Sequence, residues 1–310
     1  MKEKQFTHTC LCFGSRTEWG NFMKKQRRTR TSLCRMAVRR RNIKGHSNGK
    51  IRISRYTIES KHLPRAFCGF RIAHLSDLHG TLYGINHQLL MEKVSQVKPD
   101  CIVMTGDMAD QTPGSVPRLV QLCGRLKKRW PVYFAAGNHE QCLKRTMRAK
   151  LYHSLKEQEI TVLKNRYCKI WRQGEAIRMY GLVTPMMYYN DPLGKYRRGA
   201  HFSAKDTKRM LGEADPSVYS ILLAHNPLYY PSYRDWGADL TLSGHIHGGI
   251  IRIPGAGGLL SPDVSLFPKY DGGHFEEQGK HLIVSRGLGN HFLVRVFNPP
   301  ELVVVTLERG

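Results

Sequence analysis

The sequence predicts an α/β fold in which helices cover a sheet of parallel strands and a second sheet follows. Apolar runs alternate with segments of helical spacing over residues 70–156, and short strands separated by Gly/Pro-rich loops follow. The chain has 310 residues, of which 41% are hydrophobic, enough to bury a large core without disulfide bonds. This composition excludes a disordered or collagen-like protein, and no apolar run reaches the about 18 residues of a membrane-spanning helix.

The first half alternates short apolar runs with segments of helical spacing. The predicted strands are residues 70–75, 100–105 and 131–136. The predicted helices are residues 86–98, 115–129 and 141–156, and the first of them should end before Pro99. This order is typical of parallel strands covered by helices, and ligands gather at the carboxyl ends of such strands.

The second half has shorter elements and more Gly/Pro-rich loops. The predicted strands are residues 177–182, 219–224, 239–243, 282–286 and 302–307, with one helix near 203–213. We expect these strands to form a second sheet that packs on the first. The loops 184–201 and 250–280 should determine substrate selectivity, but they carry no readable motif.

The N-terminal segment is strongly basic. The whole chain carries a formal charge of +25, and residues 1–50 contribute 14 basic and 2 acidic side chains, or +12. We expect residues 1–50 to be a poorly ordered basic arm and residues 51–310 to be one domain. The arm lacks the apolar stretch of a secretory signal. Eight scattered cysteines without a CxxC pair predict a reduced, intracellular protein. A cytoplasmic location follows, with electrostatic contact between the arm and an anionic inner membrane face as an open alternative.

Polar residues that can bind metal follow five of the predicted strands. They are Asp77, His79, Asp107, Asn138, His225, His245 and His247. Carboxylates, amide oxygens and imidazoles are ligands for divalent ions, and the D-x-H and H-x-H spacings place both side chains on one side of an extended segment. Seven ligands are too many for one tetrahedral ion but suit two ions that share a carboxylate.

The order of these motifs closely resembles the calcineurin-like metallophosphoesterase superfamily. The motifs are Asp77-x-His79, Gly106-Asp107-x-x-Asp110, Gly137-Asn138-His139-Glu140, His225 and Gly244-His245-x-His247. The segments 74–79, 239–249 and 284–289 resemble a bacterial branch of phosphodiesterases related to hydrolases of UDP-diacylglucosamine-type lipid A precursors. The resemblance covers about residues 50–310 and implies a four-layer α/β/β/α sandwich of two mixed sheets.

The resemblance also implies a role for each residue. Asp77, His79, Asp107 and His247 would hold one divalent ion, and Asp107, Asn138, His225 and His245 would hold a second. His139 would be the catalytic residue that contacts phosphate as a general acid. Asp110 would support the site without being a ligand, and Glu140 would orient His139 or cap a helix. Manganese, iron, zinc and magnesium all accept such mixed ligands, so the identity of the ions stays open.

The function implied is a dinuclear-metal-dependent phosphoric ester hydrolase, a phosphodiesterase or pyrophosphohydrolase that uses a metal-bridging hydroxide. Its partner would be a phosphate-ester substrate, and no specific nucleic acid is predicted. The alternative is a non-catalytic protein that binds polyanions, nucleic acid or an anionic membrane, through the basic arm. Two features depart from the bacterial branch: the basic arm replaces a membrane-spanning or export segment, and Ile250 replaces a glutamine after the H-x-H-G-G motif.

Overall fold

The computed structural model describes residues 51–191, 200–249, 251–253, 257–259, 266–289 and 295–310. The chain divides into two units, Met1–Gly45 and His46–Gly310, and the fold is that of the second unit from Ile51 onwards. The predicted basic arm lies outside the described residues. Within the described ranges, none of the helices has both the length and the apolar character needed to cross a membrane.

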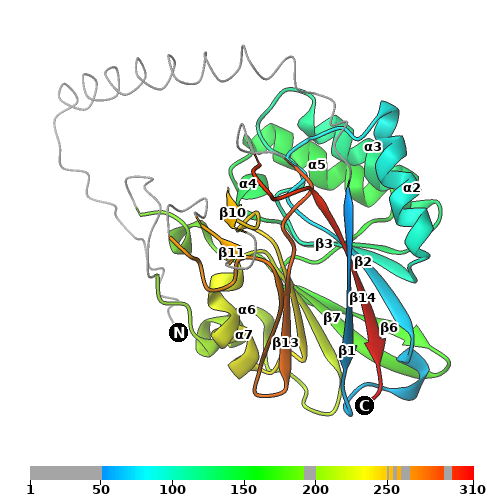
Figure 1. The fold of residues 1–310 in the computed structure, drawn as a ribbon, viewed down its shortest axis with the longest axis vertical. Coiled ribbons are helices and arrows are strands. Elements are labelled where there is room, and N and C mark those ends of the chain that lie inside the picture. Colours follow the sequence, from blue (N-terminus) through cyan, green and yellow to red (C-terminus); the bar gives the residue numbers. More distant parts are fainter. Residues whose placement is uncertain (1–50, 192–199, 250, 254–256, 260–265, 290–294) are drawn as a thin grey trace, which may run out of the picture. The chain divides into compact units, whose positions relative to one another are not determined.

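The first sheet has six strands, and its centre is parallel. In spatial order they are β1 (Arg52–Glu59), β14 (Glu301–Glu308), β2 (Phe70–Leu75), β3 (Cys101–Met104), β4 (Val132–Phe134) and β5 (Thr161–Val162). Strands β2 to β5 run parallel to one another, as the sequence predicted for the first three of them. Strand β14 runs antiparallel to β2 and parallel to β1, so the sheet is mixed (Figure 1).

The second sheet also has six strands with a parallel centre. In spatial order they are β12 (Gly273–Glu277), β13 (Lys280–Val284), β9 (Leu240–Ser243), β8 (Ser220–Ala224), β7 (Glu175–Leu182) and β6 (Arg166–Arg172). The edge strands β12 and β6 are antiparallel to their neighbours. A separate two-stranded ribbon, β10 (Arg252–Ile253) with β11 (Gly257–Gly258), follows the loop after β9.

Helices cover the outer face of each sheet, which makes a four-layer α/β/β/α sandwich (Figure 1). The first sheet is covered by α2 (Gln88–Val97), α3 (Ser115–Lys127) and α5 (Arg145–Glu157). The second is covered by α6 (Ala204–Leu211) and α7 (Tyr230–Trp236). The short helices are α4 (Asn138–Gln141), η1 (Arg65–Phe67), η2 (Ile85–His87), η3 (Met186–Tyr188) and η4 (Pro227–Tyr229).

The central strands are apolar on both faces because both faces are covered. In β2, Ala73 and Leu75 belong to the cluster under α2, α3 and α5, whereas Ile72 belongs to the cluster between the sheets. Ile221 and Leu223 of β8 enter that same inter-sheet cluster from the opposite side. A strand buried on both faces reads as a continuous apolar run, which is the pattern from which the sequence predicted these strands.

One expectation about the elements was wrong. The strand predicted at 302–307 was expected in the second sheet, but it is β14 and lies in the first. Its apolar residues face both ways, Val303 into the inter-sheet cluster and Val304 toward the helices, so their pattern suits a central strand of either sheet. The helix predicted at 141–156 is confirmed as α5, which begins four residues later because the chain turns at residues 142–144 after the short helix α4.

The edge strands β1, β6 and β12 were not predicted. Their residues are mostly exposed or half-buried, and the sequences are rich in charged side chains. A strand with so few apolar residues cannot be distinguished from a loop by its sequence pattern. Charged residues on an edge strand also protect the sheet from pairing with other chains.

His74 on β2 is a fully buried histidine at the inter-sheet layer. The Thr105 hydroxyl donates to Ser76 Oγ at 2.9 Å, so it accepts from the His74 imidazole, whose Nε2 lies 2.7 Å away. Burial lowers the pKa of His74 to about 3. The folded protein therefore holds His74 neutral, with its proton on Nε2.

This burial predicts a specific acid sensitivity. A histidine in the unfolded chain has a pKa of about 6.5, so its stabilising contribution is present above that pH and is lost as the pH falls toward the lower folded value. We expect wild type to lose about 2 kcal/mol of its free energy of unfolding in urea, relative to His74→Gln, when the pH is lowered from neutral to 5. His153→Gln, on an exposed position of α5, is the control. A difference between wild type and His74→Gln that stays constant with pH would contradict the assignment.

Candidate metal centre

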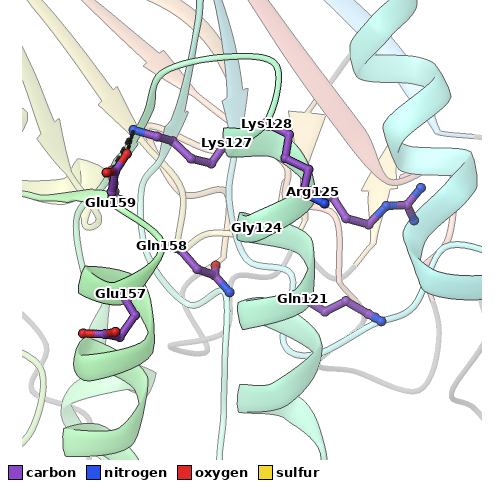
Figure 2. Close-up of a pocket in the computed structure, with 8 residues that line it drawn as sticks. All are labelled: Gln121, Gly124, Arg125, Lys127, Lys128, Glu157, Gln158 and Glu159. Carbon is purple, nitrogen blue, oxygen red and sulfur yellow. Dashed lines mark hydrogen bonds and ion pairs between the residues drawn. The ribbon is translucent and has the colours of Figure 1, made fainter.

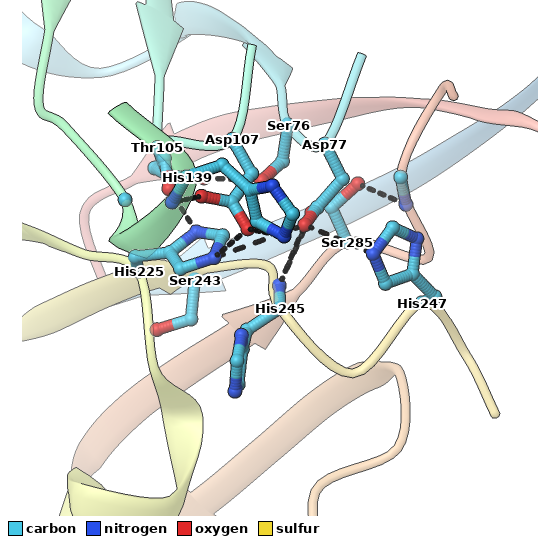
Figure 3. A network of polar contacts seen from close by, with 12 residues as sticks. Ser76, Asp77, Thr105, Asp107, His139, His225, Ser243, His245, His247 and Ser285 are labelled. Atoms are coloured by element: carbon cyan, nitrogen blue, oxygen red, sulfur yellow. Dashed lines mark hydrogen bonds and ion pairs between the residues drawn. The ribbon is translucent and has the colours of Figure 1, made fainter. Parts of the chain in front are cut away.

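Loops at the carboxyl ends of five strands, from both sheets, converge on one site (Figure 3). Asp77 and His79 follow β2, and Asp107 follows β3. The other contributors are Asn138 and His139 after β4, His225 after β8, and His245 and His247 after β9. The carboxyl ends of parallel strands lie at the same edge of each sheet, so packing the two sheets brings these loops together.

Asp77, His79 and His247 form one group that could hold a metal ion. His247 Nε2 lies 3.5 Å from Asp77 Oδ1, and His79 Nε2 lies 3.3 Å from His247 Nε2. All three residues are buried. These contacts join loops separated by 168 residues in the chain, and they bring together three of the four residues of the first ligand set that the resemblance implies.

Asp107, His225 and His245 form a second such group. His225 Nε2 lies 3.0 Å from Asp107 Oδ2 and 3.9 Å from Asp77 Oδ1. The His245 ring lies 5.0 Å from that of His225, and the His245 backbone N–H donates to both oxygens of Asp77 at 3.1 Å. Asp107 also groups with His79 and His139, so it lies between the two ligand sets, where a shared carboxylate would be required.

Asn138, beside His139 in the chain, has a buried side-chain acceptor. It is the first residue of α4, next to Gly137, and its Oδ1 is buried without a hydrogen-bond partner among the described residues. Most buried carbonyl oxygens in folded proteins have a partner, so an unpaired one calls for an explanation. A metal ion would supply the missing partner.

The backbone is strained at most of these residues. Positive φ angles occur at Asp77, His79, Asp107, His245 and His247. Such angles are costly for residues with a side chain and cluster at functional sites. Two neighbouring glycines permit the close approach, because a Cβ on Gly137 would collide with Asp107 Oδ1 and a Cβ on Gly244 would collide with Asp77 Oδ2.

The electrostatics of the site favour bound cations. Burial raises the pKa of Asp77 to about 6. Burial also acts against ionisation of Asp107, but the charges of His225 and His139 hold its pKa well below the usual range. Although burial opposes a charged imidazole, Asp107 and Asp77 raise the pKa of His225 to about 9. Two buried carboxylates thus hold a proton on His225, and divalent cations would balance the same charge, so the residues fit a metal centre.

Two further residues hold the candidate ligands in place. Glu140 accepts hydrogen bonds from the backbone N–H groups of Asp107, Ala109 and Gly137, each at 2.9 Å. It therefore caps α4, one of the two roles expected of it, and also ties α4 to the Asp107 loop. Burial, reinforced by the charge of Asp107, raises the pKa of Glu140 to about 7. The Thr105 carbonyl lies 2.7 Å from His225 Nδ1, which directs His225 Nε2 into the site.

His139 differs from the ligand candidates in its exposure. Its side chain is 28% exposed, whereas those of His79 and His225 are each 2% exposed. Its Nε2 lies 3.9 Å from Asp107 Oδ2 (Figure 3). Its ring lies edge-on to that of His79, with 4.6 Å between the ring centroids. Asp110 Oδ2 lies 4.0 Å from His79 Nδ1, whereas the other ring nitrogen of His79 faces His247.

Sequence reasoning gave no role to two neighbours of the site. The segment 285–289 packs against the Asp77 loop, with the N–H groups of Leu288 and Gly289 donating to the carbonyls of Ser76 and Asp77 at 2.9 and 2.5 Å. The sequence of this segment indicated only a resemblance to the bacterial branch of the family. Tyr189 is buried with its ring 5.3 Å from that of His245. Its position in a Met/Tyr cluster gave no signal of that contact.

A surface pocket elsewhere carries no comparable chemistry (Figure 2). It lies between the C-terminal ends of α3 and α5, and its lining mixes cations with carboxylates. The lining residues are Gln121, Gly124, Arg125, Lys127, Lys128, Glu157, Gln158 and Glu159. Lys127 is already paired there with Glu159 at 3.6 Å, so the pocket shows no uniform charge that would select a ligand.

Comparisons with known proteins identify the family. The model of the calcineurin-like phosphoesterase family matches residues 70–249. The chain is 29% identical to the uncharacterized metallophosphoesterase YkuE of Bacillus subtilis, over 83% of this chain and 86% of YkuE. It is 30% identical to an uncharacterized metallophosphoesterase of Aquifex aeolicus, over 83% of this chain and 92% of the relative. It is also 25% identical to the UDP-2,3-diacylglucosamine pyrophosphatase LpxG of Chlamydia trachomatis, over 79% and 86% of the two chains. The chain therefore belongs to the calcineurin-like phosphoesterase family and is a metal-dependent phosphohydrolase.

Proposed function

We propose that the protein hydrolyses phosphodiesters or pyrophosphates with two divalent ions held by the seven predicted ligands. The supporting observation is the position of Asp107, which groups with His79 on one side and with His225 and His245 on the other. One set would comprise Asp77, His79, Asp107 and His247. The other would comprise Asp107, Asn138, His225 and His245, with Asn138 supplying its unpaired oxygen.

The ions, when bound, would supply Lewis acidity that makes hydroxide available near neutral pH and neutralises charge on the phosphoryl group. The chain's own residues would hold the proposed ligands in a fixed geometry. Glu140 fixes the Asp107 loop through three N–H groups, and Thr105 fixes the ring of His225. Fixed ligands lose little free energy to rearrangement during the reaction.

His139 is our candidate for the general acid. A leaving alkoxide needs a proton, and an imidazole is the usual side chain for proton transfer near neutral pH. The His139 ring is partly exposed to an incoming substrate, while its backbone N–H is anchored to Asp107 Oδ1 at 2.8 Å. This combination supports a residue that contacts the phosphate and protonates the leaving oxygen.

Hydrolysis of bis(p-nitrophenyl) phosphate with added Mn²⁺ tests the proposal. Asp107→Asn should abolish turnover, because it removes the shared negative charge. His139→Ala should slow turnover by about 10²–10⁴-fold, the usual contribution of a general acid, with metal content unchanged by elemental analysis.

His153→Ala, at an exposed position of α5, is the control and should behave as wild type. Loss of bound metal in His139→Ala would contradict its assigned role. Absence of turnover by folded, metal-loaded protein on diesters, monoesters and nucleotides alike would overturn the proposed activity.

The substrate class is the second part of the proposal. Large apolar side chains are exposed on the β10–β11 ribbon and the segments that flank it; this apolar rim comprises Ile251, Ile253, Leu266, Phe267 and Phe297, which are 36–72% exposed. Backbone contacts connect the rim, since Ile251 bridges Val296 and the chain around Leu259 bonds to both Ile251 and Phe267.

The rim adjoins the loop that carries His245 and His247. Asn298, next to Phe297 in the chain, donates to the His247 carbonyl at 2.6 Å, and the Arg252 guanidinium donates to the Gly248 carbonyl at 3.0 Å. An apolar surface beside a phosphate site suits an amphiphilic pyrophosphate. LpxG, one relative of this chain, is named for such a substrate, UDP-2,3-diacylglucosamine.

Removing the rim should therefore affect amphiphilic substrates alone. We expect Leu266→Ser combined with Phe297→Ser to raise KM for a diacylated sugar-nucleotide pyrophosphate about tenfold, since burying part of two large side chains is worth at least 1.4 kcal/mol. Bis(p-nitrophenyl) phosphate should be hydrolysed as before. Trp171→Ser, an equally exposed change on the distant edge strand β6, is the matched control. An unchanged KM would reject the amphiphilic class while leaving the hydrolase intact.

The basic arm completes the proposal. Residues 1–50 would act as an electrostatic attachment to anionic membrane, with residues 51–310 as the hydrolase domain, because each basic residue near such a surface contributes about 1 kcal/mol. In liposome sedimentation, binding should require anionic lipid and should weaken on deletion of residues 1–50. Equal sedimentation with neutral vesicles would reject an electrostatic attachment.

A further inference from the structure

A second group of metal-competent side chains lies on the edge of the second sheet. Strands β12 and β13 form a tight hairpin whose two turn residues, Gln278 and Gly279, both have positive φ. Glu276 lies directly opposite His281 across the hairpin, and His274 precedes Glu276 by two positions. Since side chains alternate along a strand, all three lie on one face.

The donor atoms of these residues are close to the spacing of a coordinated ion. His274 Nε2 lies 3.1 Å from His281 Nδ1, which lies 3.8 Å from Glu276 Oε2. All three donors lie within 4.8 Å of one another. Bonds of about 2.0–2.2 Å to a tetrahedral zinc ion place two donors roughly 3.3–3.5 Å apart. Small movements of the side chains would therefore bring them onto one ion.

The three side chains differ in their exposure to solvent. The His281 side chain is only 8% exposed, so packing holds its ring in place. The Glu276 side chain is 57% exposed, which leaves room for water to complete the coordination.

We propose that His274, Glu276 and His281 form a structural site for a transition-metal ion of the Zn²⁺, Ni²⁺ or Cu²⁺ class. Imidazole nitrogen suits these ions, whereas Mg²⁺ and Ca²⁺ take mainly oxygen ligands. The ion ties the edge strand β12 to β13, which leads into the segment 285–289 beside Asp77. The site is separate from the candidate metal centre, because His281 pairs with Leu240 of β9, roughly 16 Å along the chain before His245.

Metal counting on the full-length chain tests this site. After equilibrium dialysis against Zn²⁺ and elemental analysis, the double variant His274→Ala/Glu276→Gln should hold one equivalent fewer than wild type. Both residues are exposed, so folding should be unaffected. His153→Ala removes an exposed histidine elsewhere and should hold as much zinc as wild type. Zinc bound at other histidines and cysteines is common to all these proteins, so it does not contribute to the difference between them. Equal zinc in the double variant and wild type would overturn the proposal.

Amide hydrogen exchange supplies the second measurement. Zn²⁺ should slow exchange along β12 in wild type but leave it unchanged in the double variant. The same slowing in both proteins would place the ion elsewhere and overturn the proposal. Mn²⁺-dependent hydrolase activity should be equal in the two proteins, because neither residue belongs to the candidate metal centre. Loss of that activity in the folded variant would contradict a separate structural site.

Discussion

Two buried carboxylates, Asp77 and Asp107, lie where the loops of the two sheets meet, and the surrounding residues are arranged about their negative charge. Both are at most 2% exposed, so water screens neither of them. Imidazoles and backbone N–H groups supply the opposite charge: His225 lies 3.0 Å from Asp107, and the His245 N–H donates to Asp77. A cluster built in this way requires cations when all its imidazoles are neutral, which is why the geometry agrees with metal-dependent hydrolysis.

The C-terminal strand connects this site to the rest of the fold. Because β14 lies between β1 and β2, its first residue, Glu301, reaches the loop after β13 and pairs with the buried Arg286 at 2.5 Å. The same loop then donates two N–H groups to the carbonyls of Ser76 and Asp77. The Asp77 loop of the first sheet is thus supported by a loop of the second, so relative movement of the sheets would displace the candidate ligands. Rigid support of this kind preserves ligand geometry during catalysis.

The two proposed metal sites differ in what surrounds them. At the candidate metal centre the grouped aspartates and the histidines of both candidate ligand sets are buried and come from different strand ends, whereas His139 is partly exposed. At the β12–β13 hairpin two of the three ligands are exposed, and all belong to one hairpin. The first arrangement suits chemistry on a bound phosphate, and the second suits a clamp on an edge strand. The apolar rim lies beside the first, where it would meet the part of a substrate that is not phosphate.

The sequence by itself determined the central strands, the helices α2, α3, α5 and α6, and the set of metal-competent residues, because these depend on local periodicity and on short motifs at strand ends. It did not determine the sheet to which β14 belongs, since an apolar run suits either sheet and only pairing with β1 and β2 decides. Nor did it indicate the edge strands, whose charged alternation resembles a loop, or the pairing of His281 with Glu276, which requires the register of the hairpin. Tertiary structure decided these features because each depends on contacts between chain segments whose pairing no local pattern encodes.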